Sequence, residues 1–151
     1  MDDSSTIIYN TLDEGYDFFI TDKWGENHHF KILSFMVPSG LLSDAIEVNA
    51  EASDRASIDR EPRLFQVLSD FDADVETAEL RLKAKIQKGI NIKYLTRKQG
   101  YLTIHKSKLA GRFHGDYFEV DGLKLTHEEF IQTISCYEGW HFTLKFDDDM
   151  D

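Results

Sequence analysis

The chain has 151 residues, of which 41% are hydrophobic, and a formal net charge of −11. This length and composition suit one folded domain over residues 1–151 and exclude a disordered chain, while the negative charge disfavours nonspecific binding to nucleic acid or to an anionic membrane. Because the sequence has a single cysteine, no signal-peptide pattern and no long apolar run, we expect no disulfide, no membrane span and a cytoplasmic location.

The N-terminal part of the sequence is predicted to consist mainly of strands. The polar residues 1–6 are expected to form a disordered tail. Partial alternation of apolar and polar residues predicts strands at 7–12 and 16–20. The segment 28–37 gives the strongest strand signal, and it has apolar residues at both alternating sets of positions, so we expect both of its faces to be covered. Residues 38–40 (Pro-Ser-Gly) end this strand.

Two further strands and a long loop are expected before the main helix. Residues 41–48 form a short apolar segment that is extended in its second half. Residues 49–62 are polar and have no periodicity, which is typical of a surface loop. Residues 64–68 then form another strand, which leads into the helix.

Residues 72–95 carry the longest helical pattern of the chain. Acidic residues occupy its first turns and basic residues its later turns, which is the order that the helix dipole favours. We expect Asp70 or Asp72 to be the N-cap. Gly89 leaves two interpretations open, because a glycine can end the helix, with a strand following over 90–96, or lie inside it. The apolar residues of the pattern recur at spacings of three and four and form one stripe: Phe71, Val75, Ala78, Leu82, Ile86, Ile90 and Tyr94.

The C-terminal part of the sequence contains the clearest local signals. A short strand is expected at 101–105, and Asp121-Gly122 between two apolar runs predicts a hairpin with a type I′ turn. Thr126 and Glu129 have the spacing of a capping box, so a second helix is expected to start there. Its apolar stripe is predicted to contain Phe130, Ile131, Ile134 and Tyr137. Alternating residues over 140–146 predict a half-buried closing strand, followed by a disordered acidic tail at 147–151.

These elements together predict an α+β fold. A mainly antiparallel sheet is expected to carry one long central helix and a second, C-terminal helix packed on one face.

From Leu64 onward, the order of these signals resembles an uncharacterised bacterial family that is known as a domain of unknown function. The segments that carry the resemblance are FQVLSDFDADVETAELRLKAKI (65–86), GRFHGD (111–116), VDGLKLTHEEFIQTISCYEGWHFTLKF (120–146) and HHFKILSFMVPSG (28–40). In that family a basic run similarly follows the helix, so the resemblance implies that the helix continues through Gly89 to about Leu95. The second helix of the family commonly opens with a tryptophan where this chain has His127. The family has no established activity, so the resemblance implies no catalytic residue.

No motif in the sequence indicates a metal, cofactor or catalytic site. The six histidines are His28, His29, His105, His114, His127 and His141. His28 and His29 are neighbours, so they point to opposite faces of a strand, and no H-x-H or H-x-x-x-H pair is present to place two ligands together. We therefore expect solvated or hydrogen-bonded histidines. Cys136 is expected to be a small packed residue of the second helix. The spaced acids at 72–76 are better explained by a helix start than by a calcium loop.

Charge is segregated along the chain. Residues 1–80 have a net charge of −13, residues 81–112 have ten bases and no acid, and residues 113–151 have a net charge of −8. The basic block could hold phosphates or an acidic partner, but a helix also needs a solvated face. The candidate interaction surface within this block is Arg81, Lys83, Lys85, Lys88, Arg97, Lys98, Lys106 and Lys108.

Three functions are consistent with these patterns. The first is a non-enzymatic protein-binding or regulatory module that recognises a basic partner through its acidic blocks, as an immunity protein or an acidic inhibitor would. The second is nucleic-acid binding through residues 81–112. The third is an enzyme with a dispersed site around His114, Asp116 and Glu119. A second copy of the chain is another candidate partner, because the acidic flanks of one copy could neutralise the basic block of the other.

Overall fold

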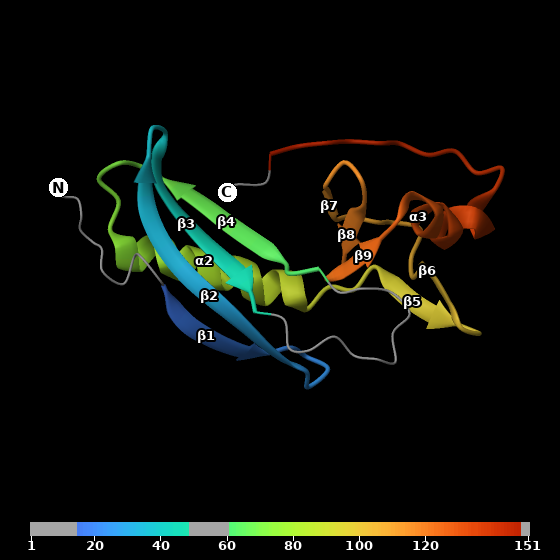
Figure 1. Cartoon of the computed structure of the whole chain (residues 1–151), viewed down its shortest axis with the longest axis horizontal. Coiled ribbons are helices and arrows are strands. Elements are labelled where there is room, and N and C mark those ends of the chain that lie inside the picture. The colour runs from blue at the N-terminus through green and yellow to red at the C-terminus, as the bar shows by residue number, and fades with distance from the viewer. Residues whose placement is uncertain (1–14, 49–60, 149–151) are drawn as a thin grey trace. The chain divides into compact units, whose positions relative to one another are not determined.

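The computed structural model describes residues 15–48 and 61–148. These residues form two compact units, the first from 15–48, 64–91 and 148 and the second from 61–63 and 92–147 (Figure 1). Length and composition, by contrast, predict one domain. The N-terminal tail, the strand predicted at 7–12 and most of the 49–62 loop lie outside the described residues.

The first unit contains a four-stranded antiparallel sheet with the strand order β1-β2-β3-β4. The strands are β1 (Tyr16–Thr21), β2 (Asn27–Val37), β3 (Gly40–Glu47) and β4 (Leu64–Ser69), which confirms the four strands predicted in this region. Gly40 has a φ of 143°, and a Cβ on it would lie 2.2 Å from the Ser69 carbonyl oxygen. The tight β2–β3 turn next to β4 therefore requires glycine at this position.

Helix α2 (Val75–Ile90) packs on one face of this sheet (Figure 1). Four residues of the predicted stripe are buried in it: Ala78, Leu82, Ile86 and Ile90. The side chains that meet them from the sheet are Phe30, Ile32, Ala45 and Val67, with Tyr16, Phe18, Ile20 and Phe65 at the margin. The prediction was wrong for Phe71, which precedes the helix and is 61% exposed.

The boundaries of α2 correct the sequence-based prediction at both ends. The N-cap is Asp74 rather than Asp70 or Asp72, and its side chain accepts a hydrogen bond from the Thr77 amide. The helix passes through Gly89 but ends at Ile90, so it has 16 residues and does not reach Leu95. Beyond it, the amides of Tyr94 and Leu95 donate to the Asp121 carboxylate. Because these amides are bonded to a side chain, they are not available for helical hydrogen bonds.

The second unit contains two small antiparallel sheets and one short helix. Its elements are β5 (Leu95–Lys98), β6 (Tyr101–Ile104), β7 (Arg112–Phe113), β8 (Phe118–Val120), β9 (Leu123–Leu125), α3 (His127–Ile134) and the 3-10 helix η1 (Ser135–Tyr137). The sheets are β5-β6 and β7-β8-β9. Leu95, Val120 and Leu125 form the buried centre of this unit, and Phe118 and Phe130 stack beside it.

Two local predictions in this unit are confirmed. Asp121 and Gly122 join β8 to β9 with φ values of 56° and 78°, and positive φ at both central residues is the mark of a type I′ turn. The capping box is present, because the Thr126 hydroxyl accepts from the Glu129 amide and the Glu129 carboxylate accepts from the Thr126 amide. The stripe of α3 differs from the prediction, since Thr133 is buried and Ile131 is 58% exposed.

The predicted closing strand is not formed. Residues 140–146 have no regular structure, and Trp140, Phe142, Leu144 and Phe146 are 67%, 87%, 69% and 68% exposed. Among the described residues, the hydrogen bond from the Trp140 amide to the Tyr137 oxygen is the only one between backbone groups in this segment. Asp147 and Asp148, the described part of the predicted acidic tail, are also exposed.

The fold class is α+β with antiparallel sheets, as predicted. The finer description differs from the structure in three respects. The central helix is shorter than expected, and the second helix has only eight residues. In addition, the two helices do not share one sheet, because α2 contacts β3 and β4 in the first unit whereas α3 contacts β6 and β9 in the second.

Candidate functional site

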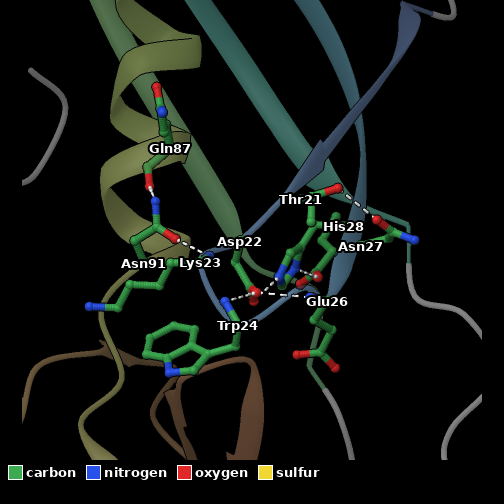
Figure 2. Close-up of polar contacts among 10 residues, drawn as sticks. Thr21, Asp22, Lys23, Trp24, Glu26, Asn27, His28, Gln87 and Asn91 are labelled. Carbon is green, nitrogen blue, oxygen red and sulfur yellow. Dashed lines mark hydrogen bonds and ion pairs between the residues drawn. The ribbon is translucent and has the colours of Figure 1, made fainter.

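The turn between β1 and β2 is organised around the buried carboxylate of Asp22. One carboxylate oxygen, Oδ1, accepts hydrogen bonds of 2.9 Å from the amides of Trp24 and Glu26. The Asp22 backbone amide donates to the Glu26 carbonyl oxygen, and the Gly25 amide donates to the Asp22 carbonyl oxygen. These four bonds hold the carboxylate in place and leave its other oxygen, Oδ2, directed at His28 (Figure 2).

His28 lies between two carboxylates that are almost fully buried. Its Nε2 atom is 2.8 Å from Asp22 Oδ2, and its Nδ1 atom is 3.5 Å from Glu47 Oε2. The exposed fractions of the three side chains are 9% for His28, 1% for Asp22 and 6% for Glu47. Both ring nitrogens of this histidine therefore face an acid in a site with little access to water.

The electrostatics of the cluster favour an ionised Asp22. Burial opposes ionisation of this carboxyl group, but the hydrogen bonds from His28 and from the amides of Glu26 and Trp24 outweigh it, so the pKa of Asp22 is lowered below its ordinary value. Glu26 adds a third acidic group, because ligand atoms of Asp22, Glu26 and His28 all lie within 4.8 Å of one another. Unlike Asp22, Glu26 is exposed.

The same turn is joined to the end of α2. The Lys23 amide donates to Asn91 Oδ1 at 2.7 Å, and Asn91 Nδ2 donates to the Gln87 carbonyl oxygen at 2.8 Å (Figure 2). The position of the turn is thus set by two elements of the first unit, the β1–β2 hairpin and α2.

A second feature of the first unit is a concavity of about 560 Å³ beside the N-terminal half of α2. Its lining residues are Tyr16, Asp74, Val75, Glu76, Glu79, Leu80 and Lys83. Two apolar side chains in it face solvent, since Val75 is 39% and Leu80 is 61% exposed. Asp70, Asp72 and the exposed Phe71 precede it in the sequence. We call these ten residues the acidic groove.

Glu79 lines the acidic groove, and hydrogen bonds from the sheet hold its side chain in place. Its carboxylate accepts hydrogen bonds from the Tyr16 hydroxyl at 2.8 Å and from the Ser34 hydroxyl at 2.5 Å, and Ser34 is 2.8 Å from the Ser43 hydroxyl. Burial, together with the hydrogen bond to Glu79 and its negative charge, raises the pKa of Tyr16 above its ordinary value. The Lys83 ammonium lies over the rings of Tyr16 and Phe18 at 5.3 and 5.1 Å.

The predicted basic surface is divided between the two units. On α2, Arg81 donates to the Ser69 hydroxyl and Lys85 donates to the Gln66 carbonyl oxygen, so both side chains turn toward β4. With Lys83 lying over the aromatic rings, three of the four helical cations are used within the first unit. The fourth, Lys88, is exposed.

The remaining four cations of that surface belong to the second unit. Arg97, Lys98, Lys106 and Lys108 are all exposed. Arg97 donates to the Gly100 carbonyl oxygen across the β5–β6 turn at 3.4 Å. The eight residues that the sequence grouped together therefore lie in two sets of four.

The residues proposed for a dispersed enzyme site have separate partners. Glu119 is buried and accepts a hydrogen bond from the Gly122 amide, whereas the exposed ring of His114 stacks on Tyr117 at 4.5 Å and Asp116 is exposed. Cys136 is exposed, which corrects the prediction that it is packed, and its sulfur lies 3.6 Å from the Thr103 hydroxyl.

Sequence reasoning found the opposite orientation of His28 and His29 but missed the cluster around His28. His29 stacks on Phe19 and bonds to Asp17, on the other side of the strand. Asp22, Glu26 and His28 are close in sequence and were missed because the sequence criterion required two histidines, whereas Glu47 comes from β3 and no spacing along the sequence links it to Asp22. In the pairing of β2 with β3, Phe30 faces Glu47, and this register places the Glu47 carboxylate beside the His28 ring.

The two family matches meet at residue 91, where the first unit passes into the second at the end of α2. The family model described as "Domain of unknown function (DUF7686)" matches residues 13–91, which is more than half of the chain. The chain belongs to the DUF7686 family. A second model, "Domain of unknown function (DUF7713)", matches residues 91–151. The DUF7686 match contains residues 15–48 and 64–91 of the first unit, and with them Asp22, Glu26, His28 and the acidic groove.

No curated protein and no solved structure matches this DUF7686 chain. Neither α2 nor α3, the helices of the described residues, has the length and apolar character that a membrane-crossing helix needs.

Proposed function

We propose that this protein is a protein-binding module whose acidic groove receives a basic, partly apolar segment of a partner protein. The observation that carries the proposal is the combination, in one concavity, of the carboxylates of Asp74, Glu76 and Glu79 with exposed Val75 and Leu80. Exposed acids would attract lysine or arginine, and exposed apolar side chains would supply the area that a charged contact alone lacks.

Supporting evidence comes from the charge around the groove. Residues 70–76 hold four acids and no base. Two of them, Asp70 and Asp72, lie before the helix and are exposed, so they extend the negative surface beyond the residues that line the concavity. A surface of one charge sign speeds the encounter with a partner of the opposite sign, and its effect weakens as salt rises.

A matched pair of variants tests the proposal. Asp74→Asn combined with Glu76→Gln removes two charges from the groove, and asparagine remains a good N-cap, so α2 is kept. Asp116→Asn combined with Glu128→Gln removes the same charge from exposed positions of the second unit. Proteins captured from a lysate of the source organism are compared by mass spectrometry, and a purified partner is then titrated against each variant.

We expect a captured basic protein to bind the wild type and the second-unit variant equally, and to bind the groove variant at least about tenfold more weakly. Its affinity for the wild type should also fall as salt is raised from about 50 to 300 mM. If the groove variant keeps the wild-type affinity for every partner, the groove is not the binding surface. Capture of nucleic acid alone would favour the basic residues of 81–112 instead.

A further inference from the structure

The residues at the tip of the β1–β2 hairpin have the composition of a metal site with three protein ligands. Asp22, Glu26 and His28 each offer one ligand atom, and these atoms lie within 4.8 Å of one another. One imidazole nitrogen and two carboxylate oxygens form a donor set that suits Zn²⁺ or another first-row divalent metal. Tetrahedral donors at about 2.1 Å from Zn²⁺ lie about 3.4 Å apart. His28 Nε2 and Asp22 Oδ2 are 2.8 Å apart, so these two ligands need only a small outward shift to admit the ion between them.

The surroundings of these ligands provide a second, independent observation. A histidine that binds a metal through one ring nitrogen usually donates the N–H of the other to a carboxylate, and a ligating carboxylate is usually hydrogen-bonded through its free oxygen. Here His28 Nδ1 faces Glu47 Oε2 at 3.5 Å, while Asp22 Oδ1 accepts from the amides of Trp24 and Glu26. Both buried ligands are thus already oriented by the groups that support ligands in metal sites.

Charge and access complete the argument. The ligand group places the carboxylates of Asp22 and Glu26 beside one imidazole, and a divalent cation at their centre would balance both negative charges. Glu26 is exposed, which gives the ion a path from solvent and lets this side chain rotate to close the coordination. Water can fill the positions that the three protein ligands leave open.

From this geometry we infer that His28 Nε2, Asp22 and Glu26 bind a divalent transition-metal ion, with Glu47 orienting the histidine. The site is separate from the acidic groove in its residues, and it does not depend on the protein-binding proposal. Figure 2 shows its three ligands at the β1–β2 turn, next to the Lys23–Asn91 bond that joins this turn to α2. Because all three ligands belong to the hairpin, bound metal would hold the β1–β2 turn itself together.

The chain offers a matched control for this site in the neighbouring residue. His29 Nε2 is 2.8 Å from Asp17 Oδ1, the same separation as in the His28–Asp22 pair. However, the side chain of His29 is 31% exposed and that of its partner Asp17 is 48% exposed. If a histidine–carboxylate pair alone were enough to bind the ion, both histidines would contribute to binding. If binding requires the surrounding carboxylates of Asp22, Glu26 and Glu47 as well, only His28 would contribute to it.

The test is a calorimetric titration of the full-length, EDTA-treated protein with Zn²⁺, repeated with Mg²⁺, and a visible absorption spectrum with Co²⁺. We expect one Zn²⁺ per chain and a Co²⁺ spectrum that shows nitrogen and oxygen ligation, with binding of Mg²⁺ at least about tenfold weaker, because imidazole is a poor ligand for that ion. His28→Gln and Glu26→Gln should each weaken Zn²⁺ binding by about tenfold or more, and His29→Gln by less than about twofold.

Circular dichroism of each variant shows whether it is folded. Glu26 is exposed, so Glu26→Gln tests the site even if His28→Gln unfolds. The inference is overturned if the wild type binds no Zn²⁺. It is equally overturned if Glu26→Gln leaves the affinity unchanged, or if His29→Gln weakens binding as much as His28→Gln does, since the ion would then be held by surface histidines in general.

Discussion

At the scale of single residues, Glu119 shows how burial can make the stability of the second unit depend on pH. Its side chain lies under the β8–β9 turn and accepts a hydrogen bond from the Gly122 amide. Burial raises the pKa of Glu119 above its ordinary value of 4.5, and the Gly122 hydrogen bond and the charges of Arg63, Arg112 and His114 only partly oppose this. The folded protein therefore holds this proton more tightly than the unfolded chain does.

The direction of the pH effect follows from this difference in proton binding. Ionisation of Glu119 costs the folded state more than the unfolded state, so its contribution to stability falls as pH rises from 4.5 through the raised pKa. Glu119→Gln removes the charge and keeps an acceptor for the Gly122 amide. We expect the variant to gain on the order of 1 kcal/mol in unfolding free energy relative to wild type between pH 4 and pH 7.

Urea unfolding at pH 4, 5, 6 and 7 measures this difference, and Glu128→Gln, an exposed acid of the same unit, is the control that should show no such trend. A difference between Glu119→Gln and wild type that is constant across this range would show that Glu119 does not titrate as its burial requires.

Residue-level patterns in the sequence predicted packing correctly where the residues concerned lie in one element. The spacing of Leu82, Ile86 and Ile90 placed them correctly in the core, because side chains three and four apart on a helix must share a face. The same spacing failed for Phe71, since it assumes a helix and the residue lies before the Asp74 N-cap. Asp22, Glu26 and His28 lie within seven residues of one hairpin, but the contact of His28 with Glu47 depends on the pairing of β2 with β3, which no residue pattern specifies.

At the scale of elements, Asn91 determines how α2 ends. Its backbone amide bonds to the carbonyl oxygens of Lys88 and Gly89, its side-chain amide bonds to the Gln87 carbonyl oxygen, and its Oδ1 accepts from the Lys23 amide. The side chain thus satisfies one carbonyl that the helix end leaves open and ties the β1–β2 turn to it.

We expect Asn91→Ala to lower the unfolding free energy by about 1–2 kcal/mol, because two hydrogen bonds are lost and the Lys23 amide is left without its acceptor. Gln87→Ala is the control, since the carbonyl oxygen that Gln87 contributes remains and exposed substitutions usually cost less than about 0.5 kcal/mol. Chemical denaturation gives both values. Equal effects of the two substitutions would mean that the Asn91 bonds do not hold the helix end.

Strong local signals predicted elements correctly, and signals that need a distant partner did not. The Asp121-Gly122 turn and the Thr126 capping box formed because each is completed by residues within a few positions of it. The alternation over 140–146 indicates which side chains a strand would bury. A strand also needs the edge of a neighbouring strand to pair with, and no described strand pairs with this segment. The predicted extension of α2 to Leu95 failed for a similar reason, because Asp121, 26 residues away, binds the Leu95 amide.

At the scale of the whole molecule, the division at residue 91 has a thermodynamic consequence. Each unit has its own buried cluster, with Leu82 in the first and Leu125 in the second, and both residues are fully buried. The two family models also meet at residue 91. Composition and length predict one domain because they determine how much apolar surface a chain can bury. They do not determine whether that surface is buried in one hydrophobic core or in two.

We expect the two units to unfold in separable transitions. Leu82→Ala should destabilise the first unit and Leu125→Ala the second, each by about 2–5 kcal/mol, because each leaves a cavity in a different core.

The two tryptophans provide separate probes, since Trp24 lies in the first unit and Trp140 in the second. Fluorescence of Trp140→Phe therefore follows the first unit, and fluorescence of Trp24→Phe follows the second. In urea unfolding, each core substitution should shift the midpoint that its own tryptophan reports by at least about three times the shift of the other. Coincident transitions in both single-tryptophan proteins, moved equally by either core substitution, would instead mean that the chain unfolds as one cooperative domain.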